Sequence, residues 1–232
     1  MFKGRHVDRS VILVCVRWYL AYSLILRDLE EMMAERGISV DQATVGRWVV
    51  RYSPELLERF IRRKRPVSRK WHVDETYIKV RGRWTYLYRA IASNGDSVEL
   101  CFSERRNLAA AKRSRSRALK RHGWSERIVI DGSQTNWEAI LSFDTTNRLQ
   151  ERSRRESKPI RIRQSRYLNN RIEKDHRAVQ RRVRPMLGFK SMNSARGVLS
   201  GMEMVHMMRK GQPKYPGNRH PSIAEQFERL GA

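Results

Sequence analysis

The spacing of apolar residues near the start of the chain is helical. Val11, Val14 and Trp18 recur at intervals of three or four residues, which predicts a helix that begins after Asp8 or Ser10. Because residues at this spacing share one face of a helix, the segment should pack that face against other helices.

Two further helices are predicted around a short turn. The first covers Leu24–Arg36 and ends at Gly37, and the second covers Gln42–Tyr52 after the capping residue Asp41. Two helices joined in this way are typical of a helix-turn-helix, whose second helix enters the major groove of DNA. Two packed helices of an ordinary helical domain would give the same pattern.

The pattern changes after Pro66. Pro54 and Pro66 enclose a further short helix, Pro66–Ser68 predicts a linker, and beyond it apolar residues fall on alternate positions. Tight turns at Arg81–Arg83 and Asn94-Gly95 divide this stretch into an antiparallel meander. Its three predicted strands are Lys70–Val80, Trp84–Ala92 and Ser97–Ser103.

Helices and strands then alternate. The predicted helices are Leu108–His122, Asn136–Phe143, Asn169–Arg184 and Ser191–Arg209, and the predicted strands are Arg127–Asp131 and Pro159–Arg163. A meander followed by alternating helices and strands is the order of a ribonuclease H-like α/β fold, a mixed sheet flanked by helices. We expect residues 1–65 to form an all-helical helix-turn-helix domain, residues 66–210 to form the ribonuclease H-like domain, and residues 211–232 to form a tail that is poorly ordered before Ile223.

The chain carries a large excess of positive charge. Its 49 lysines and arginines against 24 acids give a formal net charge of +25 over 232 residues. The basic residues are concentrated in two acid-free runs, Arg59–Lys70 and Arg105–Arg121, and in the segment Arg148–Arg184. A solvated helix face usually alternates in sign, whereas clustered basic residues are typical of proteins that bind nucleic acid.

Composition excludes several other classes of protein. A hydrophobic content of 40% is enough for a packed core, which excludes a disordered basic tail. Two cysteines, Cys15 and Cys101, cannot build a disulfide scaffold. The most apolar stretch, Val11–Leu26, is short and contains Arg17, so we expect no membrane span, no signal peptide and a location in the prokaryotic cytoplasm.

Three acidic residues occupy positions that need an explanation. Asp74 lies inside a predicted strand, Asp131 ends a buried strand and Glu173 lies on a strongly basic helix. Each has a structural alternative: Asp131 could cap a turn, Glu173 could pair with Arg177 four residues on, and Glu75 takes the place of Asp74 if the register is shifted. If the three acids meet, their hard oxygen atoms suit Mg²⁺ or Mn²⁺, and two such ions support phosphoryl transfer.

Long sequence strings surround these acids. They are WHVDETYIKVRGRWTYLYRAI, IVIDGSQTN and YLNNRIEKDHRAVQRRVRPMLGF, with RDLEEMMAERGISVDQATVGRWV near the N-terminus. Together they resemble the DDE transposases of the insertion-sequence six family. The resemblance implies that Asp74, Asp131 and Glu173 are the catalytic acids and bind two Mg²⁺ or Mn²⁺ ions. It also implies cleavage at the ends of the element and attack of the freed 3′-hydroxyl on target DNA.

The expected partners follow from that resemblance. A homo-oligomer of at least two subunits, associated with the nucleoid and not with a membrane, would bind double-stranded DNA at the terminal inverted repeats of the element and at the target. The side chains expected to contact DNA lie on the helix-turn-helix, on the basic run after it and on the Glu173 helix: Gln42, Arg47, Arg51, Arg62, Arg63, Lys64, Arg177 and Arg181.

Several positions depart from the pattern of the family. Asp131 and Glu173 are separated by 41 residues, more than is usual, so residues 144–158 are expected to be an insertion. The other departures are Gln180 in place of a basic residue, Ala92 in place of an expected Asp, and Ser114-Arg115-Ser116 on an otherwise apolar helix face. These departures do not touch the three acids, but they leave an alternative function open, a weakened or inactive relative that competes for the element ends. A nuclease without strand transfer is a third candidate.

The histidines and aromatic residues near the acids each have more than one interpretation. His72 and His176 flank two of the acids and are expected to orient them, to contact DNA phosphate or simply to pack. The aromatic residues of the strands are expected to be sheet core rather than platforms for base stacking: Trp71, Tyr77, Trp84, Tyr86 and Tyr88.

Overall fold

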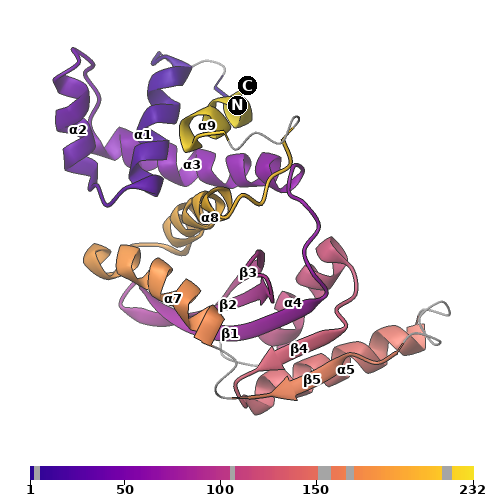
Figure 1. Cartoon of the computed structure of the whole chain (residues 1–232). Coiled ribbons are helices and arrows are strands. Elements are labelled where there is room, and N and C mark those ends of the chain that lie inside the picture. The colour runs from indigo at the N-terminus through magenta and orange to yellow at the C-terminus, as the bar shows by residue number, and fades with distance from the viewer. Residues whose placement is uncertain (3–5, 105–107, 151–157, 166–169, 216–220) are drawn as a thin grey trace. The chain divides into compact units, whose positions relative to one another are not determined.

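The chain folds into two compact units. We call them the helical unit, Met1–Arg65 with Phe189–Ala232, and the sheet unit, Pro66–Gly188. The change of unit at Pro66 coincides with the predicted linker, but residues 189–210 belong to the helical unit and not, as predicted, to the α/β domain. This computed structural model describes residues 1–2, 6–104, 108–150, 158–165, 170–215 and 221–232 (Figure 1).

The helical unit is built from helices near both ends of the chain. They are α1 (Arg9–Ala21), α2 (Leu26–Ala34), α3 (Gln42–Ile61), α8 (Met192–Arg209) and α9 (Ile223–Gly231). α3 packs along α8, and α1 contacts α3, α8 and α9. The predicted caps are present: Asp8 accepts a hydrogen bond from the Ser10 amide at 2.7 Å, and Asp41 accepts one from the Thr44 amide at 2.8 Å.

The helix α3 continues past Pro54, where a separate short helix was predicted. Proline cannot donate a backbone hydrogen bond to the carbonyl of Val50, four residues earlier. The helix persists because Trp48, Tyr52 and Leu56 keep its apolar face buried on both sides of the proline. None of the helices in the described ranges is both long and apolar enough to cross a bilayer.

A close approach between α3 and α8 explains why α8 joins the helical unit. A Cβ atom on Gly197 of α8 would lie 2.8 Å from both the Cα and the carbonyl oxygen of Val50. Only glycine allows the two helix backbones to come so near. Apolar periodicity in α8 showed that one face is buried, but not which unit buries it.

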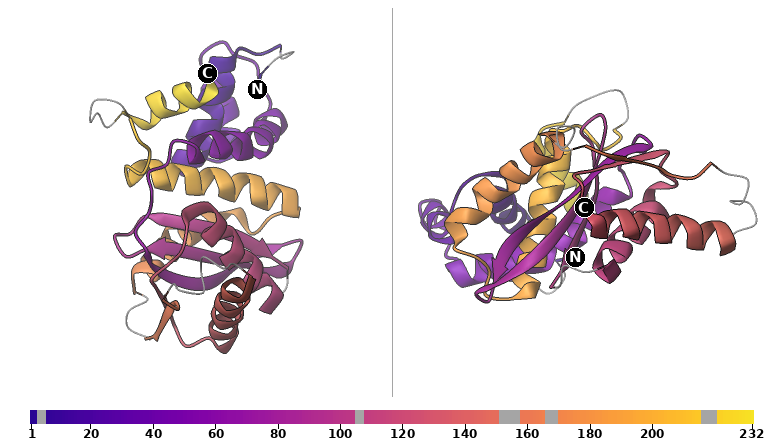
Figure 2. Two further views of the ribbon diagram at one scale, coloured as in Figure 1. Left: turned by 90° about the vertical axis from the view of Figure 1, so that its right-hand side faces the viewer. Right: turned by 90° about the horizontal axis from the view of Figure 1, so that it is seen from below.

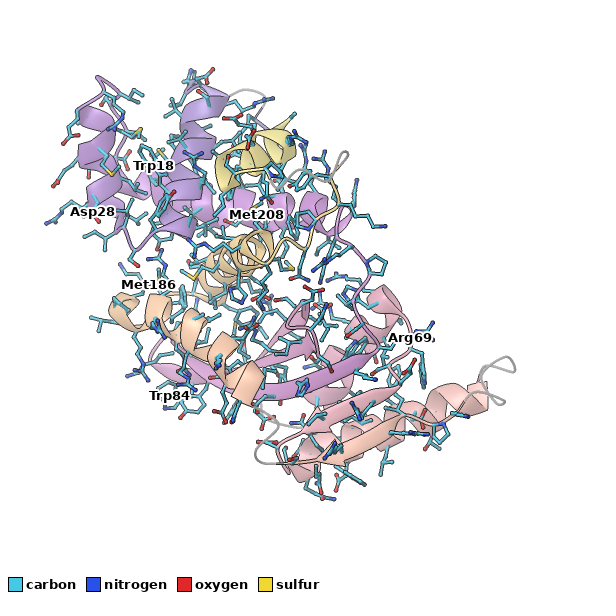
Figure 3. The ribbon with its side chains drawn as sticks, viewed as in Figure 1. Trp18, Asp28, Arg69, Trp84, Met186 and Met208 are labelled. Carbon is cyan, nitrogen blue, oxygen red and sulfur yellow. The ribbon has the colours of Figure 1, made fainter. Side chains whose placement is uncertain are left out.

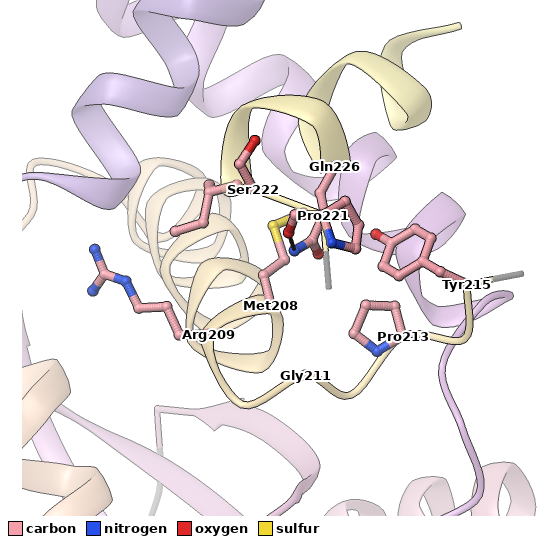
Figure 4. A pocket seen from close by; sticks show the side chains of 9 residues that line it. Met208, Arg209, Gly211, Pro213, Tyr215, Pro221, Ser222 and Gln226 are labelled. Atoms are coloured by element: carbon pink, nitrogen blue, oxygen red, sulfur yellow. Dashed lines mark hydrogen bonds between the residues drawn. The ribbon is translucent and has the colours of Figure 1, made fainter. Parts of the chain in front are cut away.

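Residues 211–215, the start of the predicted tail, are held in place by hydrogen bonds, whereas residues 216–220 lie outside the described part of the chain. The Arg65 amide donates to the Gln212 carbonyl at 2.9 Å, and the Lys214 amide donates to the Arg63 carbonyl at 2.8 Å. These bonds tie the segment to the end of α3, and with α8 and α9 it lines a pocket of about 320 Å³ (Figure 4). The helix predicted from Ile223 is confirmed as α9.

The sheet unit contains a mixed five-stranded sheet in the order β3-β2-β1-β4-β5. β1, β2 and β3 form the predicted antiparallel meander, while β4 and β5 run parallel to β1. This arrangement confirms the predicted ribonuclease H-like fold. The strands are β1 (Lys70–Val80), β2 (Arg83–Ala92), β3 (Ser97–Ser103), β4 (Arg127–Ile130) and β5 (Arg161–Gln164).

Helices cover both faces of this sheet (Figure 2). α4 (Leu108–His122) and α5 (Gln134–Gln150) lie on one face, where Trp71 packs with Ile140 and other apolar side chains. α7 (Asn170–Val183) lies on the opposite face and contacts β1 and β2. A short 3₁₀ helix, η1, continues α7 over Arg184–Met186.

One prediction for these helices is wrong and another is confirmed. α5 is longer than the predicted Asn136–Phe143 and runs into the expected insertion, of which residues 151–157 lie outside the described part. Ser114 is 4% exposed, so a polar side chain does lie on the buried face of α4, between the small residues Ala111 and Ala118. The side chain of Arg115 lies outside the described residues.

The α3–α8 contact predicts a stability effect at Gly197. Gly197→Ala should lower the free energy of unfolding by about 1–3 kcal/mol, because the added methyl group meets the Val50 backbone, which cannot move cheaply. Chemical denaturation monitored by circular dichroism measures this change. The neighbouring exposed residue gives the control, Arg196→Ala, which should change stability little. Equal stability of Gly197→Ala and wild type would contradict the close contact.

Candidate active site

Two of the predicted acids lie level with each other on adjacent parallel strands. The pairing of β4 with β1 covers Lys70–His72, with His72 opposite Val129. Asp74 and Asp131 each come two residues further along their strands, at the point where β4 separates from β1. Sites of α/β proteins commonly form at the carboxyl ends of parallel strands, and this register brings both carboxylates to one such end.

The third acid lies in the first turn of α7, which polar side chains tie to β1. His176 Nδ1 lies 3.6 Å from Asp74 Oδ2, and Gln180 Nε2 donates to Thr76 Oγ1 at 2.8 Å. Glu173 precedes His176 by three residues, so both lie on the same side of the helix. The tie between His176 and Asp74 therefore directs the Glu173 end of α7 toward the acids of the sheet.

A buried ion pair fixes α7 to β2 as well. Arg89 Nη2 lies 3.3 Å from Asp175 Oδ2, and Arg89 Nη1 donates to the Asp175 main-chain carbonyl at 3.0 Å. The Arg89 side chain is 0% exposed and that of Asp175 is 12% exposed. Arg89 is also the cross-strand partner of Asp74 in the β1–β2 register. One arginine thus connects the strand pair that carries Asp74 to the helix that carries Glu173.

Burial raises the pKa of the Asp74 carboxyl to about 7, from an ordinary 3.8. A hydrogen bond from the Glu75 amide to Asp74 Oδ1, at 2.8 Å, acts in the opposite direction and lowers the pKa. The negative charges of Asp131, Glu75 and Glu173 raise it again. Asp131 and Glu173 are thus near enough to Asp74 to oppose its ionisation.

The other two acids have their own local partners. Asp131 Oδ1 accepts a hydrogen bond from the Ser133 amide at 3.1 Å, and Glu173 Oε2 lies 3.9 Å from Arg177 Nη2. Both side chains are exposed. Both structural alternatives are therefore present, the turn role of Asp131 and the i,i+4 pair of Glu173, and neither removes the acids from the neighbourhood of Asp74.

Glu75 belongs to the opposite face of the sheet. Its Oε2 accepts a hydrogen bond from Asn136 Nδ2 of α5 at 2.8 Å. Because successive side chains of a strand point to opposite faces, Asp74 faces α7 while Glu75 faces α5. The register therefore places Asp74 and not Glu75 beside Glu173.

The donor chemistry of this site suits a divalent cation. Carboxylate oxygens are the ligands preferred by Mg²⁺ and Mn²⁺, and a buried carboxyl whose ionisation is opposed by nearby acids gains from a positive charge. The side chains are not drawn together as a finished cage: within the described ranges, no three His, Cys, Asp or Glu side chains are grouped closely enough to hold one ion.

Comparison with known proteins identifies the family. The sequence model of a DDE domain matches residues 68–212, which include all three acids. The transposase for insertion sequence-like element IS431mec of Staphylococcus aureus is 33% identical over 210 residues, 90% of this chain and 88% of that protein. The chain belongs to the insertion-sequence six family of DDE transposases. The resemblance seen in the sequence is confirmed.

Two further similarities were found. The transposase for insertion sequence element IS257 in transposon Tn4003 of Staphylococcus aureus is also 33% identical over 90% of this chain and 88% of its own. Among solved structures, the HTLV-2 integrase catalytic core domain in complex with magnesium, in trimeric form, is 11% identical. It covers 60% of this chain and 86% of that chain, with a TM-score of 0.39.

The residues predicted to bind DNA are divided between the two units of this transposase. On the helical unit, Lys64 is half-buried and the others are exposed: Gln42, Arg47, Arg51, Arg62 and Arg63. Arg47 Nη2 donates to Thr44 Oγ1 at 2.6 Å in the first turns of α3. Arg177 and Arg181 are exposed on α7 of the sheet unit. Their role in DNA binding stays a prediction.

Sequence reasoning missed the residues that hold α7. Arg89 stood in the apolar string WTYLYRAIA, and a charge inside a buried strand signals a partner elsewhere in the chain. Gln180, noted as a departure from the family, turns inward to Thr76. At the position where an Asp was expected, Ala92 is fully buried. The nearest acid in sequence is Asp96, which accepts a hydrogen bond from Asn94 Nδ2 at 2.8 Å in the following turn.

The raised pKa of Asp74 predicts a pH-dependent stability difference. Between pH 4 and 7 the folded protein holds this proton more tightly than the unfolded chain, so ionisation of Asp74 destabilises the metal-free fold as pH rises through about 7. Asp74→Asn stays neutral. In EDTA, wild type should therefore lose stability relative to Asp74→Asn as the pH rises from 4 to 7. The difference between their free energies of unfolding should change by up to about 4 kcal/mol in favour of the variant.

Urea denaturation at a series of pH values measures this difference. Glu126→Gln is the control, because the Glu126 side chain is 60% exposed and its loss should leave the pH profile unchanged. A pH-independent difference between Asp74→Asn and wild type would contradict the buried, acid-crowded environment of Asp74.

Proposed function

We propose that this transposase cleaves DNA at the ends of its insertion sequence and joins the freed 3′-hydroxyl to target DNA, with Asp74, Asp131 and Glu173 as catalytic acids. The observation that carries the proposal is the pKa of Asp74, which burial and the charges of Asp131 and Glu173 raise to about 7. Perturbed carboxyls of this kind cluster at functional sites. Family membership indicates the class of reaction, and the three acids indicate where in the fold it would take place.

The three acids are proposed to hold two Mg²⁺ or Mn²⁺ ions. When bound, such ions activate the attacking oxygen and stabilise the leaving oxygen of a phosphoryl transfer. Without them, Asp74 keeps a proton near neutral pH, and ligation requires that this proton leave. His176, 3.6 Å from Asp74, is placed to orient that carboxylate, and the same contact directs the Glu173 end of α7 toward it.

The exposed polar residues of α3 are proposed to read the terminal inverted repeats. Gln42, Arg47 and Arg51 are exposed on a helix that follows a short turn, as in a recognition helix for the major groove. Phosphate contacts are assigned to Arg62, Arg63, Lys64, Arg177 and Arg181. The net charge of +25, summed over the whole chain, supports binding of a polyanion such as DNA.

Bringing two DNA ends together requires at least two subunits, so we propose a homo-oligomer that acts at the nucleoid, in the cytoplasm of a prokaryote.

A second candidate function, an inactive relative that competes for the same ends, is favoured by two observations. The side chains of the acids are not gathered into an ion cage, and Gln180 binds Thr76 rather than offering a cation to DNA. Catalysis and binding must therefore be measured separately.

The first test is strand transfer with Asp131→Asn. Purified protein is incubated with an oligonucleotide from the DNA that flanks this reading frame, a target plasmid, and Mg²⁺ or EDTA. Wild type should yield joined products only with Mg²⁺, and Asp131→Asn should reduce them about a hundredfold or more, since it removes several kcal/mol of transition-state stabilisation. Glu126→Gln, at an exposed acid of the same unit, should stay active.

The outcomes separate the candidate functions. Nicking without joining would identify a nuclease. Tight binding of the ends without any Mg²⁺-dependent product from wild type would identify the competing relative, and would overturn the catalytic proposal.

The second test separates sequence reading from phosphate contact. Arg47→Ala should reduce the preference for end DNA over scrambled DNA, by about 1–3 kcal/mol, because a base contact is lost. Arg62→Ala should weaken binding to both DNAs equally and reduce the slope of log affinity against log salt by about 1. Fluorescence anisotropy over a salt series measures both. Identical behaviour of the two variants would contradict the assignment of α3 as the reading helix.

A further inference from the structure

Two large aromatic side chains of the sheet unit are exposed and in contact with each other. Tyr77 of β1 is 57% exposed and Trp84 of β2 is 58% exposed, although both were expected in the sheet core. Their ring centroids are 4.9 Å apart with an interplanar angle of 78°, an edge-to-face arrangement. Trp84 lies at the outer edge of this unit (Figure 3). Single exposed apolar residues are common, but a fixed aromatic pair needs an explanation.

The pair is exposed because the β1–β2 hairpin extends past the helices on one face. Trp71 and Val73 are covered by α4 and α5, and Glu75 on the same face is bound by Asn136 of α5. Strand alternation places Tyr77 next on this face, beyond the last of these contacts. On the opposite face, Thr76 is buried and bound to α7. On the face of Tyr77, the contacts of the described residues end at Tyr86, which pairs with Tyr77 and packs against the cluster that includes Ala110 of α4. The hairpin end beyond it is supported by α7 on the opposite face.

The surroundings of the pair are cationic. Lys79 lies across from Trp84 in the strand register. Arg81 and Arg83 are exposed at the hairpin turn, where Arg81 (φ 50) and Gly82 (φ 75) adopt the left-handed conformation. Between Thr76 and Asn94 the sequence contains no acid. An aromatic surface bordered by lysine and arginine combines the two groups that bind a single nucleic-acid strand: rings for bases and cations for phosphates.

The same charge disfavours a second copy of this chain as the occupant. Two copies meeting at this hairpin would bring identical acid-free, cationic tips together, in a protein whose net charge is already +25. Like charges placed together oppose association. A polyanion with planar, apolar faces fits both features at once.

The position of the Tyr77–Trp84 pair relative to the acids fits a DNA strand that leaves the active site. Tyr77 follows Asp74 by three residues, about 10 Å along an extended strand. The two side chains point to opposite faces, but the pairing of β1 with β4 covers only Lys70–His72 in the described part of the sheet. Beyond His72, this edge of β1 has no strand partner among the described residues, and a single strand that joins the two faces would pass round it there.

We propose that Tyr77 and Trp84 form a stacking site for an unpaired base of the DNA strand beside the reacting phosphate, with Lys79, Arg81 and Arg83 on its phosphates. The inference rests on the proposed function in one respect, that the ligand is DNA. It adds that the enzyme holds a locally unpaired strand, outside the double helix read by α3.

The test measures DNA binding without catalysis. The full chain carrying Asp131→Asn is titrated in EDTA against a fluorescein-labelled blunt duplex and against the same duplex with a short single-stranded extension. Trp84→Ala and, separately, Tyr77→Ala should weaken binding of the extended duplex about 5- to 150-fold relative to the blunt one. Trp84→Phe should retain most of the affinity. An abasic nucleotide in the extension should reproduce the loss in the parent protein and add little in Trp84→Ala.

Tyr22→Ala is the matched control, because Tyr22 is similarly exposed, at 52%, but belongs to the helical unit. It should leave the preference for the extension unchanged. Equal losses on both DNAs in Trp84→Ala and Tyr77→Ala, or no loss in either, would overturn the stacking site while leaving the proposed function standing. Failure of the parent protein to bind any DNA would overturn both. A lower oligomeric state of Trp84→Ala in sedimentation, with unchanged DNA binding, would show that the pair is a subunit interface instead.

Discussion

The buried ion pair between Arg89 and Asp175 determines where the third acid lies. α7 is strongly basic and carries few apolar residues, of which Ile172, Val179 and Val183 are buried. So small an apolar stripe gives weak control over the register of a helix on a sheet. The guanidinium of Arg89 contacts both the carboxylate and the main-chain carbonyl of Asp175, which leaves one position for the helix. A slip of one turn would move Glu173 by about 5.4 Å.

The Arg89–Asp175 ion pair is needed because the negative charges of the three acids repel one another. Asp131 and Glu173 lie near enough to oppose the ionisation of Asp74, and the Asp74 side chain is itself nearly buried. Without a proton or a cation the arrangement costs free energy, so packing elsewhere must hold it. Basic side chains near the acids contribute little to offset this cost: Arg177 pairs with Glu173 at 3.9 Å in an exposed position, and Arg89 is directed to Asp175.

Periodicity and turn residues predicted most elements of both units, including the meander and the order of helices and strands along the chain. They could not predict which unit takes α8, because Gly197 gives no periodic signal and acts only through the close approach of Val50. The candidate acids were found as residues out of place in their elements, but the ties through Arg89 and Gln180 join segments far apart in sequence. The exposure of Trp84 was missed for a related reason: alternation assigns a side chain to a face of the sheet, and only the reach of α4 and α5 decides whether that face is covered.

The discontinuous helical unit has a consequence for synthesis of the protein. The sheet unit is a continuous segment, so all of its residues are available once the ribosome has passed Gly188. The helical unit must wait for α8 and α9, which complete the packing of α1 and α3. A chain that stopped between Gly188 and Met192 would therefore keep every candidate catalytic acid yet lose α8 and α9, the helices that pack against α1 and α3. Truncation at this point would leave the sheet unit whole and the helical unit without its C-terminal half in a single step.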